Sequence, residues 1–412
     1  MQAVEPPVRA KPDAKLRVLF VDDEPQVLHG LRDMLRKKRK VWDMTFVPGG
    51  EEALELLRTQ SYDVLVSDMR MPGVDGATLL QFAHENHPKM IRIILSGHTE
   101  MEAAMRVVPV AHQFVMKPCS PQGLASVITR AQKTQQLITD DDIRFFCGRM
   151  SQLPVLPSSY NALSKALVDE NTGAPEVAKI LADDIGMTAK VLQLSNSAFF
   201  RVSRRITKVE DAVVYLGFQT IKNLVMSVGV FSEAVLDDCE ELRACYQKSM
   251  AVAAVSADLA TSKEMKDDAF MAGMLHEIGL LVLASQLPDF YADARRLADE
   301  RQASIRDVFR SDFNVSVSEI GAYLLGLWGI PYPIIEAVAH CRHPHNVEPQ
   351  DEPSVLSCVA IAHDMVEAVR SEKDPLEAVD HAYVARLKVA PRQLERASYM
   401  AVDALQAAGE AP

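Results

Sequence analysis

Residues 18–24 read VLFVDDE, residues 66–76 VSDMRMPGVDG, residues 94–97 ILSG and residues 114–118 FVMKP. In each segment a short apolar run is followed by polar or charged residues. Such runs alternate with amphipathic helical patterns from Lys15 onward, which is typical of a parallel sheet with helices on both faces. The predicted strands are Val18–Val21, Met44–Val47, Val64–Val66, Ile91–Leu95 and Phe114–Met116. We therefore expect an α/β domain in the first 140 residues.

Polar side chains that suit phosphoryl transfer follow these strands. They are Asp22, Asp23, Asp68, Ser96 and Lys117. Because the carboxyl ends of parallel strands meet at one edge of a sheet, we expect them to share one crevice. Three carboxylates repel one another unless a cation neutralises them, and an all-oxygen site suits Mg²⁺. Asp68 would be the nucleophile, and Lys117 and Ser96 would stabilise the transferred group. Alternatively, each aspartate only caps the following helix.

The four quoted segments, in this order, resemble the receiver domain of two-component response regulators, which has a flavodoxin-like (βα)5 fold. The resemblance implies that Asp68 is the phosphoacceptor. It also implies that Asp23, Asp68 and the backbone carbonyl of Arg70 hold Mg²⁺, with Asp22 reaching the ion through water. The phosphoryl donor would be a cognate sensor histidine kinase or a phosphotransfer protein.

Three further residues match the switch positions of receivers. Lys117 matches the family's lysine and Ser96 its switch hydroxyl. Phe114 lies three residues before the lysine, where receivers carry an aromatic side chain that swings inward when the hydroxyl engages the phosphoryl group. An ordinary core phenylalanine is the alternative for Phe114.

A helical pattern over Pro121–Thr139 leads to the LPVLP segment at residues 153–157, where the prolines favour an extended chain and mark a new domain. Beyond it the apolar periodicity is helical. The predicted units are a disordered tail (1–14), a receiver domain (15–135), a connector (136–152), a helical output domain (153–350) and a C-terminal helical extension of it (351–412).

The output region resembles the HDOD domain, an all-α degenerate relative of the HD-superfamily phosphohydrolases. The resemblance is carried by LPVLP together with DDIGMTAKVLQLSNSAFF (183–200), AVVYLGFQTIKNLV (212–225), GMLHEIGLLVL (273–283) and YLLGLWGIPYPIIEAVAHCRHP (323–344). We accordingly expect a protein of more than one domain, with an α/β half and an all-α half.

The metal site of the HD superfamily looks dismantled in this chain. Its degenerate counterpart would comprise His276, Glu277 and His340, while other ligand positions carry Lys248, Val317 and Cys341. We therefore expect no cofactor and no catalysis in the output domain, which would bind protein partners under the control of phosphorylated Asp68. The alternative is a metal-dependent phosphohydrolase acting on cyclic di-GMP or a nucleotide. In the non-catalytic case, His276 and His340 would be buried and hydrogen-bonded to each other or to Glu277.

The composition indicates which classes of binding partner and which cellular compartment to expect. The formal net charge of −12 argues against nucleic acid, and the basic run Arg36–Lys40 fits the end of a solvated helix. Six cysteines without a CxxC pair indicate neither a zinc site nor a disulfide framework. We find no signal peptide and no apolar run near the roughly 18 residues of a membrane span. We expect a cytoplasmic protein, not inserted in a membrane, that binds proteins and possibly forms a homodimer.

Overall fold

The computed structural model describes the greater part of the chain. The described residues are 15–97, 107, 110–119, 121–137, 141–150, 153–155, 162–163, 165–166, 172–196, 206–217, 221, 231–233, 240–347 and 351–407. The predicted tail, residues 1–14, lies outside them, as does part of the predicted connector.

The N-terminal half is a five-stranded parallel sheet, as predicted, and its strand order is β2-β1-β3-β4-β5. Its strands are β1 (Leu16–Val21), β2 (Trp42–Val47), β3 (Val64–Asp68), β4 (Ile91–Ser96) and β5 (Gln113–Met116). The helices α1 (Pro25–Met34), α2 (Gly50–Thr59), α3 (Gly76–Asn86) and α5 (Pro121–Leu137) accompany them. Every residue of β3 and β4 is buried, because helices cover a parallel sheet on both faces.

The basic run Arg36–Lys40 forms a short 3-10 helix, η1, directly after α1. None of its residues is buried, and the Lys38 ammonium lies 5.3 Å from the centre of the Trp42 ring. The run is therefore solvated, as expected, although it forms a separate helix rather than the end of α1.

The C-terminal half is largely helical, as predicted. Its elements are α6 (Asp141–Arg149), β6 (Leu153–Val155), α8 (Ala174–Ala182), α9 (Ile185–Asn196), α10 (Val209–Leu216), β7 (Phe231–Glu233), α12 (Glu240–Leu259), α13 (Lys263–Leu275), α14 (Ile278–Gln286), α15 (Pro288–Arg301), α16 (Ile305–Phe313), α17 (Val317–Leu327), α18 (Tyr332–His340), η4 (Pro344–Asn346), α19 (Val355–Arg370), α20 (Pro375–Ala378), α21 (His381–Arg386) and α22 (Pro391–Ala407).

One feature of this half departs from the all-α expectation. Strands β6 and β7 pair in parallel as a two-stranded sheet. Proline disfavours the helical conformation in itself and in the residue before it, so residues 153–155 at the start of the LPVLP segment are extended and available for pairing.

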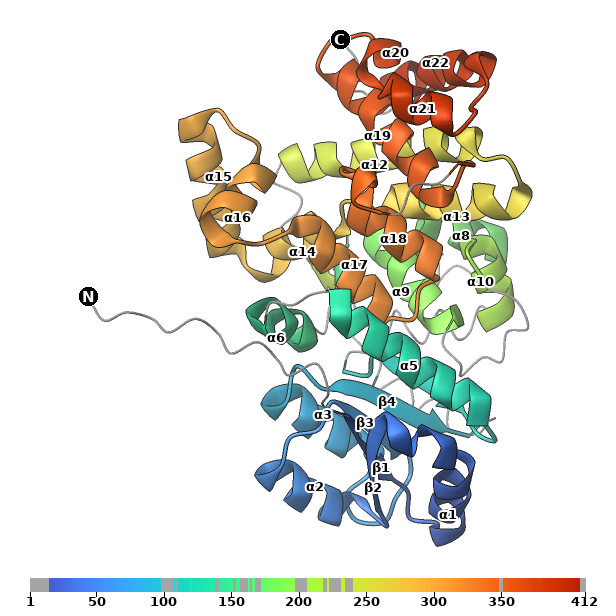
Figure 1. The fold of residues 1–412 in the computed structure, drawn as a ribbon, viewed down its shortest axis with the longest axis vertical. Coiled ribbons are helices and arrows are strands. Elements are labelled where there is room, and N and C mark those ends of the chain that lie inside the picture. Colours follow the sequence, from blue (N-terminus) through green and yellow to red (C-terminus); the bar gives the residue numbers. More distant parts are fainter. Residues whose placement is uncertain are drawn as a thin grey trace.

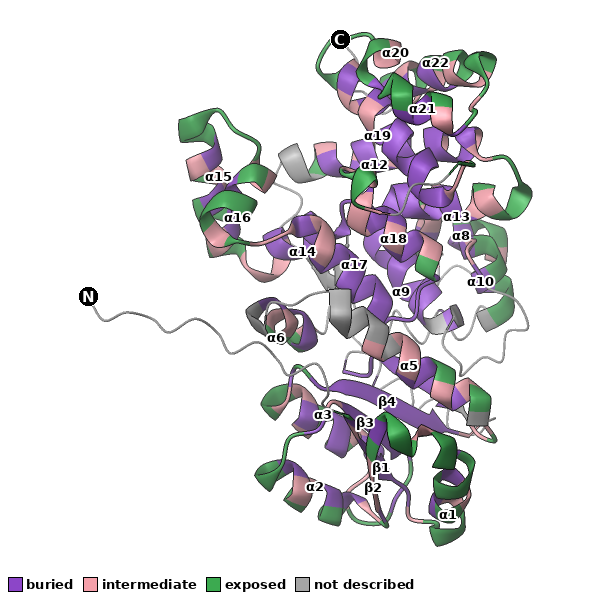
Figure 2. Ribbon diagram, viewed as in Figure 1, coloured by how far each residue is buried: buried purple, intermediate pink, exposed green. Residues whose placement is uncertain are grey.

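The core of the helical half lies where α12, α13 and α19 pack together (Figures 1 and 2). Helix α14 crosses α17 so closely that a Cβ added at Gly279 would stand 2.0 Å from the carbonyl oxygen of Val317. Serine side chains begin several of these helices by accepting a backbone N–H, as Ser262 does from Met265. The two halves meet where α5 lies between the sheet and α17 (Figure 1).

One described stretch, Lys263–Gln286, is long and apolar enough to cross a membrane by length and composition. This differs from the expectation that no such run exists. However, 89% of its most apolar 18-residue window is buried inside the fold, where the stretch forms the core helices α13 and α14.

Candidate functional site

The predicted phosphoacceptor lies at the carboxyl edge of the parallel sheet. Asp68 ends β3, and Lys117 follows β5. The Lys117 Nζ atom lies 2.6 Å from Asp22 Oδ2 and also forms an ion pair with Asp68 Oδ1. One ammonium thus bridges carboxylates from β1 and β3, and the structure brings together three of the residues singled out in the sequence.

Burial and neighbouring charges shift the pKa values of Asp68 and Lys117 in opposite directions. Burial raises the pKa of Asp68 above its ordinary value, although the Lys117 ammonium opposes the rise. Burial by itself would lower the pKa of Lys117, but hydrogen bonds and charge from Asp68 and Asp22 raise it. Lys117 therefore stays protonated at neutral pH and can balance charge on a phosphoryl group.

The donor set at this edge fits a magnesium ion. Asp22 is fully buried, Asp68 is nearly so and Asp23 is half-buried. The Arg70 N–H donates to Asp68 Oδ2 at 3.1 Å, so the Arg70 backbone lies beside the carboxylate. Asp22 and Asp68 share the Lys117 ammonium, and Asp23 adds a third carboxylate next to Asp22 in the chain, so one divalent cation would balance the remaining charge through hard oxygen ligands.

The predicted switch residues lie on the two neighbouring strands. Ser96 is fully buried at the end of β4, where its carbonyl oxygen accepts the N–H of Lys117 at 2.8 Å. Phe114, on β5, pairs with Ile94 of β4 and is 2% exposed. Its ring is thus in an inward position, which a core phenylalanine and an engaged switch aromatic would both occupy.

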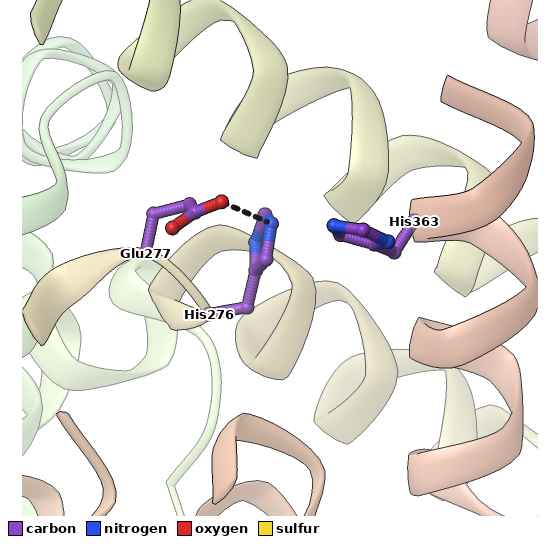
Figure 3. A group of neighbouring side chains, drawn as sticks. All are labelled: His276, Glu277 and His363. Atoms are coloured by element: carbon purple, nitrogen blue, oxygen red, sulfur yellow. Dashed lines mark ion pairs between the residues drawn. The ribbon is translucent and has the colours of Figure 1, made fainter. Parts of the chain in front are cut away.

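A second polar cluster is buried in the helical half (Figure 3). His276 and Glu277 connect α13 to α14, and His363 lies on α19. Ligand atoms of the three residues lie within 4.8 Å of one another. His276 contacts the Gly273 carbonyl oxygen through Nδ1 at 2.6 Å, and its Nε2 lies 3.4 Å from Glu277 Oε1 without hydrogen-bond geometry.

His340, which we expected in this cluster, is not a member of the three-residue group. It ends α18 and is only half-buried, whereas His363 faces His276 with the ring centres 5.7 Å apart. The sequence feature that could have pointed to His363 is a histidine within a largely apolar helical run, VLSCVAIAHDMVEAV.

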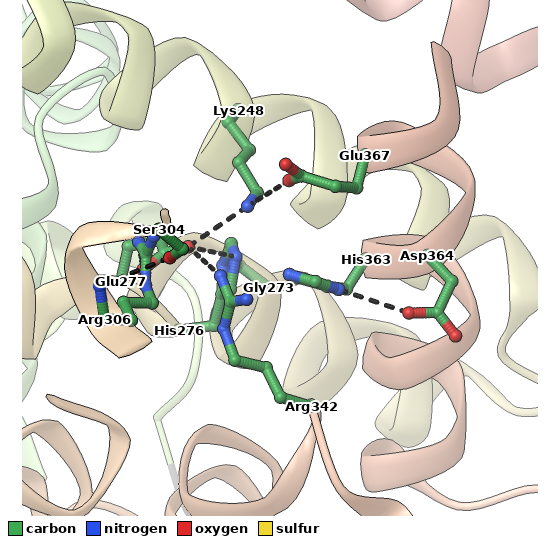
Figure 4. Close-up of polar contacts among 10 residues, drawn as sticks. All are labelled: Lys248, Gly273, His276, Glu277, Ser304, Arg306, Arg342, His363, Asp364 and Glu367. Atoms are coloured by element: carbon green, nitrogen blue, oxygen red, sulfur yellow. Dashed lines mark hydrogen bonds and ion pairs between the residues drawn. The ribbon is translucent and has the colours of Figure 1, made fainter. Parts of the chain in front are cut away.

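Three cations surround the Glu277 carboxylate (Figure 4). Lys248 Nζ lies 3.3 Å and Arg342 Nη2 2.9 Å from Glu277 Oε1, and Arg306 forms an ion pair with Oε2. Lys248 is 3% exposed and also contacts Glu367 at 2.5 Å. Burial alone would raise the pKa of Glu277, but the three cations hold it well below its usual range. Glu277 is thus an ionised carboxylate whose charge is already compensated.

This cluster does not fit a divalent metal ion. An ion held by Glu277 would stand beside Lys248, Arg306 and Arg342, all positively charged. Burial lowers the pKa of His276 and His363, so both imidazoles are neutral. His276 lies beside the compensated Glu277, whereas His363 Nδ1 contacts the partly exposed Asp364 carboxylate at 3.3 Å. Burial also raises the pKa of the Cys341 thiol to about 11, which disfavours the thiolate that metals bind.

Comparison with protein families identifies both halves. Residues 18–129 match the response regulator receiver domain, and residues 153–344 match the HDOD domain. The chain is a response regulator of receiver–HDOD architecture. The Lys117 bridge between Asp22 and Asp68 lies within the receiver domain, and the buried residues His276 and Glu277 lie within the HDOD domain.

Individual relatives cover parts of this architecture. An uncharacterized protein of Treponema pallidum is 24% identical over 251 residues, which is 60% of this chain and 48% of that protein. The hydrogenase transcriptional regulatory protein HoxA of Cupriavidus necator is 34% identical over 130 residues, 31% of this chain and 26% of HoxA. The chain thus spans half or less of these curated relatives. The crystal structure of the MmoQ response regulator from Methylococcus capsulatus is 21% identical, with a TM-score of 0.48, covering 60% of this chain and 98% of MmoQ.

Direct hydrogen bonds join the receiver to the HDOD domain. At the start of β5 the Gln113 side chain donates to the Leu327 carbonyl oxygen at 3.1 Å. Arg130 of α5 donates to the Gly329 carbonyl oxygen at 3.3 Å. Gly329 has a φ of +74°, which lets the chain turn after α17 against the Gln113 side chain.

Arg92 forms a further hydrogen-bonded contact, here between the receiver and the connector helix α6. Its side chain is fully buried at the start of β4, and its Nη2 lies 2.9 Å from His112 Nε2. Its guanidinium donates to the backbone carbonyl oxygens of Pro88, Met90, Val110 and Gly148. Among the described residues no carboxylate forms an ion pair with Arg92, so backbone carbonyl groups and the His112 imidazole solvate its charge. Sequence reasoning missed this residue.

Proposed function

We propose that the protein is a phosphorylation-gated response regulator in which Asp68 accepts a phosphoryl group and the HDOD domain binds protein partners without catalysis. The observation that carries the proposal is the Lys117 bridge between Asp68 and Asp22 in a chain with receiver and HDOD domains. The donor would be a sensor histidine kinase or phosphotransfer protein, and the protein would act in the cytoplasm as a monomer or a homodimer.

The chemistry at Asp68 follows from the neighbouring charges. An ionised Asp68 oxygen forms a bond to the donor's phosphorus as the bond from phosphorus to the donor's histidine nitrogen breaks. Bound Mg²⁺ would supply charge neutralisation for the phosphoryl oxygens, held by Asp22, Asp23, Asp68 and the Arg70 carbonyl. Lys117 then pairs with the phosphoryl group instead of the free carboxylate, and the Ser96 hydroxyl donates to it.

We propose that strands β4 and β5 transmit the change. Ser96 and Lys117 lie at their carboxyl ends, and Arg92 and Gln113 lie at their amino ends. Arg92 binds the connector helix and Gln113 binds α17 of the HDOD domain. A shift of either strand therefore reaches the output domain through hydrogen bonds, and a packed interface of this kind favours discrete arrangements.

The surroundings of Glu277 support a non-catalytic output. A hydrolytic centre must hold a metal and generate hydroxide from its bound water. Here Lys248, Arg306 and Arg342 compensate the carboxylate that would hold the ion. This charge arrangement argues against the alternative of a phosphohydrolase acting on cyclic dinucleotides or nucleotides. The net charge of −12 likewise argues against nucleic acid as the partner.

The proposal is tested with acetyl phosphate and Mg²⁺, followed by intact-protein mass spectrometry. The wild-type protein should gain one phosphoryl group and the Asp68→Asn variant none, while Asp33→Asn, an exposed position on α1, serves as the matched control. Undiminished labelling of Asp68→Asn would refute the assignment. Affinity capture from cell extract with wild type and Asp68→Ala then reports whether phosphorylation changes the bound proteins.

A further inference from the structure

A strongly basic surface lies at the amino-terminal edge of the receiver sheet, where η1 leads into β2. It consists of the five consecutive cations of η1 and one cation on either side of them, namely Lys15, Arg32 and Arg36–Lys40. All of these side chains are exposed except that of Lys38, which is half-buried. We propose that this basic surface binds a short acidic segment of a partner protein.

The cations of the basic surface are not neutralised from within the part of the chain that the structure describes. None of them forms an ion pair with a described carboxylate. The Lys15 ammonium instead donates to the Arg39 carbonyl oxygen at 2.9 Å, and the Lys38 ammonium lies over the Trp42 ring. Their charges are therefore available to an anionic ligand.

The distribution of charge along the chain favours a short ligand over an extended polyanion. Residues 32–43 contain six lysines and arginines and only two acidic residues, Asp33 and Asp43. Because the whole chain carries a net charge of −12, the remainder of it is more acidic still. A nucleic acid duplex or an anionic membrane extends beyond the basic surface and would be repelled by that remainder. A short acidic peptide contacts the basic surface alone.

Exposed apolar side chains at both ends of η1 indicate that the ligand is a protein segment. Met34 ends α1 and is 43% exposed, and Val41 directly follows η1 and is 53% exposed. Protein interfaces combine apolar contacts with a charged periphery, and methionine and arginine are enriched in them. We therefore expect the acidic segment to carry apolar residues between its carboxylates.

The position of the basic surface leaves the phosphoacceptor accessible. All strands of the sheet are parallel, so the start of β2 and Asp68 at the end of β3 lie at opposite edges, about 17 Å apart along the strand direction. Strand β2 is also the outer strand on the side of the sheet away from β5, whose Gln113 contacts the HDOD domain (Figure 1). The basic surface can thus be occupied whether or not Asp68 is phosphorylated.

Fluorescence anisotropy of labelled peptides titrated with the full-length protein tests the proposal. The probes are two peptides of equal charge and length, with repeating Glu-Glu-Leu or Glu-Glu-Ser sequences. We expect saturable binding that weakens as NaCl is added, with the leucine peptide binding more tightly. The triple variant Lys37→Gln, Arg39→Gln, Lys40→Gln should bind both peptides about tenfold more weakly, because three exposed ion pairs are lost. The double variant Met34→Ser, Val41→Ser should bind the two peptides equally.

A matched control removes the same charge from the helical half. It is the triple variant Lys263→Gln, Lys266→Gln, Lys373→Gln, in which all three lysines are exposed. Because every replaced cation is exposed, both triple variants should fold, which circular dichroism verifies.

Several results would overturn the proposal. They are no saturable binding, unchanged binding by the basic-surface variant, equal weakening by the control variant, no preference for the leucine peptide, or tighter binding of a short DNA duplex or of phosphatidylglycerol vesicles through the same cations. The titration uses unphosphorylated protein, so its outcome is separate from that of the proposed function.

Discussion

Arg92 Nη2 donates a 2.8 Å hydrogen bond to the Gly148 carbonyl oxygen and thereby ties the receiver sheet to the connector helix. The approach is close enough that a Cβ added at Gly148 would lie 1.8 Å from the Pro88 carbonyl oxygen. A buried guanidinium satisfied by backbone and imidazole groups holds three chain segments, at residues 88–92, 110–112 and 148, in one arrangement.

Replacing Arg92 by methionine should destabilise the protein. The substitution leaves several buried carbonyl oxygens without a donor, and each orphaned group costs about 1–3 kcal/mol. We expect the midpoint of urea unfolding to fall clearly, whereas Arg36→Met, on the exposed helix η1, should change stability by less than about 0.5 kcal/mol. Equal effects of the two substitutions would contradict a structural role for Arg92.

The domain interface should relay phosphorylation. In the wild-type protein, acetyl phosphate with Mg²⁺ should change amide hydrogen exchange along 97–150 and in α17. The double variant Gln113→Leu, Arg130→Gln lacks both side-chain hydrogen bonds to the end of α17. It should accept phosphate normally, yet the change in α17 should disappear. A wild-type response of α17 in this variant would remove the proposed route, and Gln81→Leu on the exposed face of α3 is the control.

Lys117→Ala should separate phosphorylation from output. Without the ammonium, Asp22 and Asp68 lose the cation that bridges them, and the phosphoryl group loses its link to the loop after β5. We expect an intact fold by circular dichroism and no exchange response in α17 after treatment with acetyl phosphate. A normal response would show that the ammonium does not couple the two events.

Glu277 should stabilise the HDOD domain in a pH-dependent way. The three cations lower its folded-state pKa below the ordinary value of 4.5, so its contribution is present above that value and is lost as pH falls through the folded pKa. Removing one member of a buried ion pair costs about 3–5 kcal/mol. Urea unfolding of Glu277→Gln should therefore differ most from wild type at neutral pH and converge with it in acid. Glu300→Gln, at an exposed pair on α15, should show no such trend.

The HDOD domain should be catalytically silent. The cations around Glu277 already compensate the carboxylate that would hold a hydrolytic metal beside His276, so the purified protein should contain well under one transition metal per chain. It should not hydrolyse cyclic dinucleotides or nucleotides with Mn²⁺, Mg²⁺ or Fe²⁺. Stoichiometric metal together with turnover that is lost in His276→Ala would instead establish the phosphohydrolase.

The convergence of the receiver site residues could be predicted from the local sequence pattern and one topological rule. Asp22, Asp68 and Lys117 each follow an apolar run, and parallel strands bring their carboxyl ends to one edge. The sequence thus determined the sheet, the largely helical second half and the convergence of these residues without any knowledge of side-chain packing.

Only the tertiary structure reveals the contact of Arg92 with the connector helix and the buried cluster around Glu277 in the HDOD domain. Arg92 reaches Gly148 across 56 positions in the chain, and Glu277 is compensated by Arg342 across 65. The replacement of His340 by His363 depends likewise on how α19 packs against α13. Such contacts are set by helix crossings, which have no periodic signature in the sequence, because the same amphipathic pattern permits several packing partners and rotations.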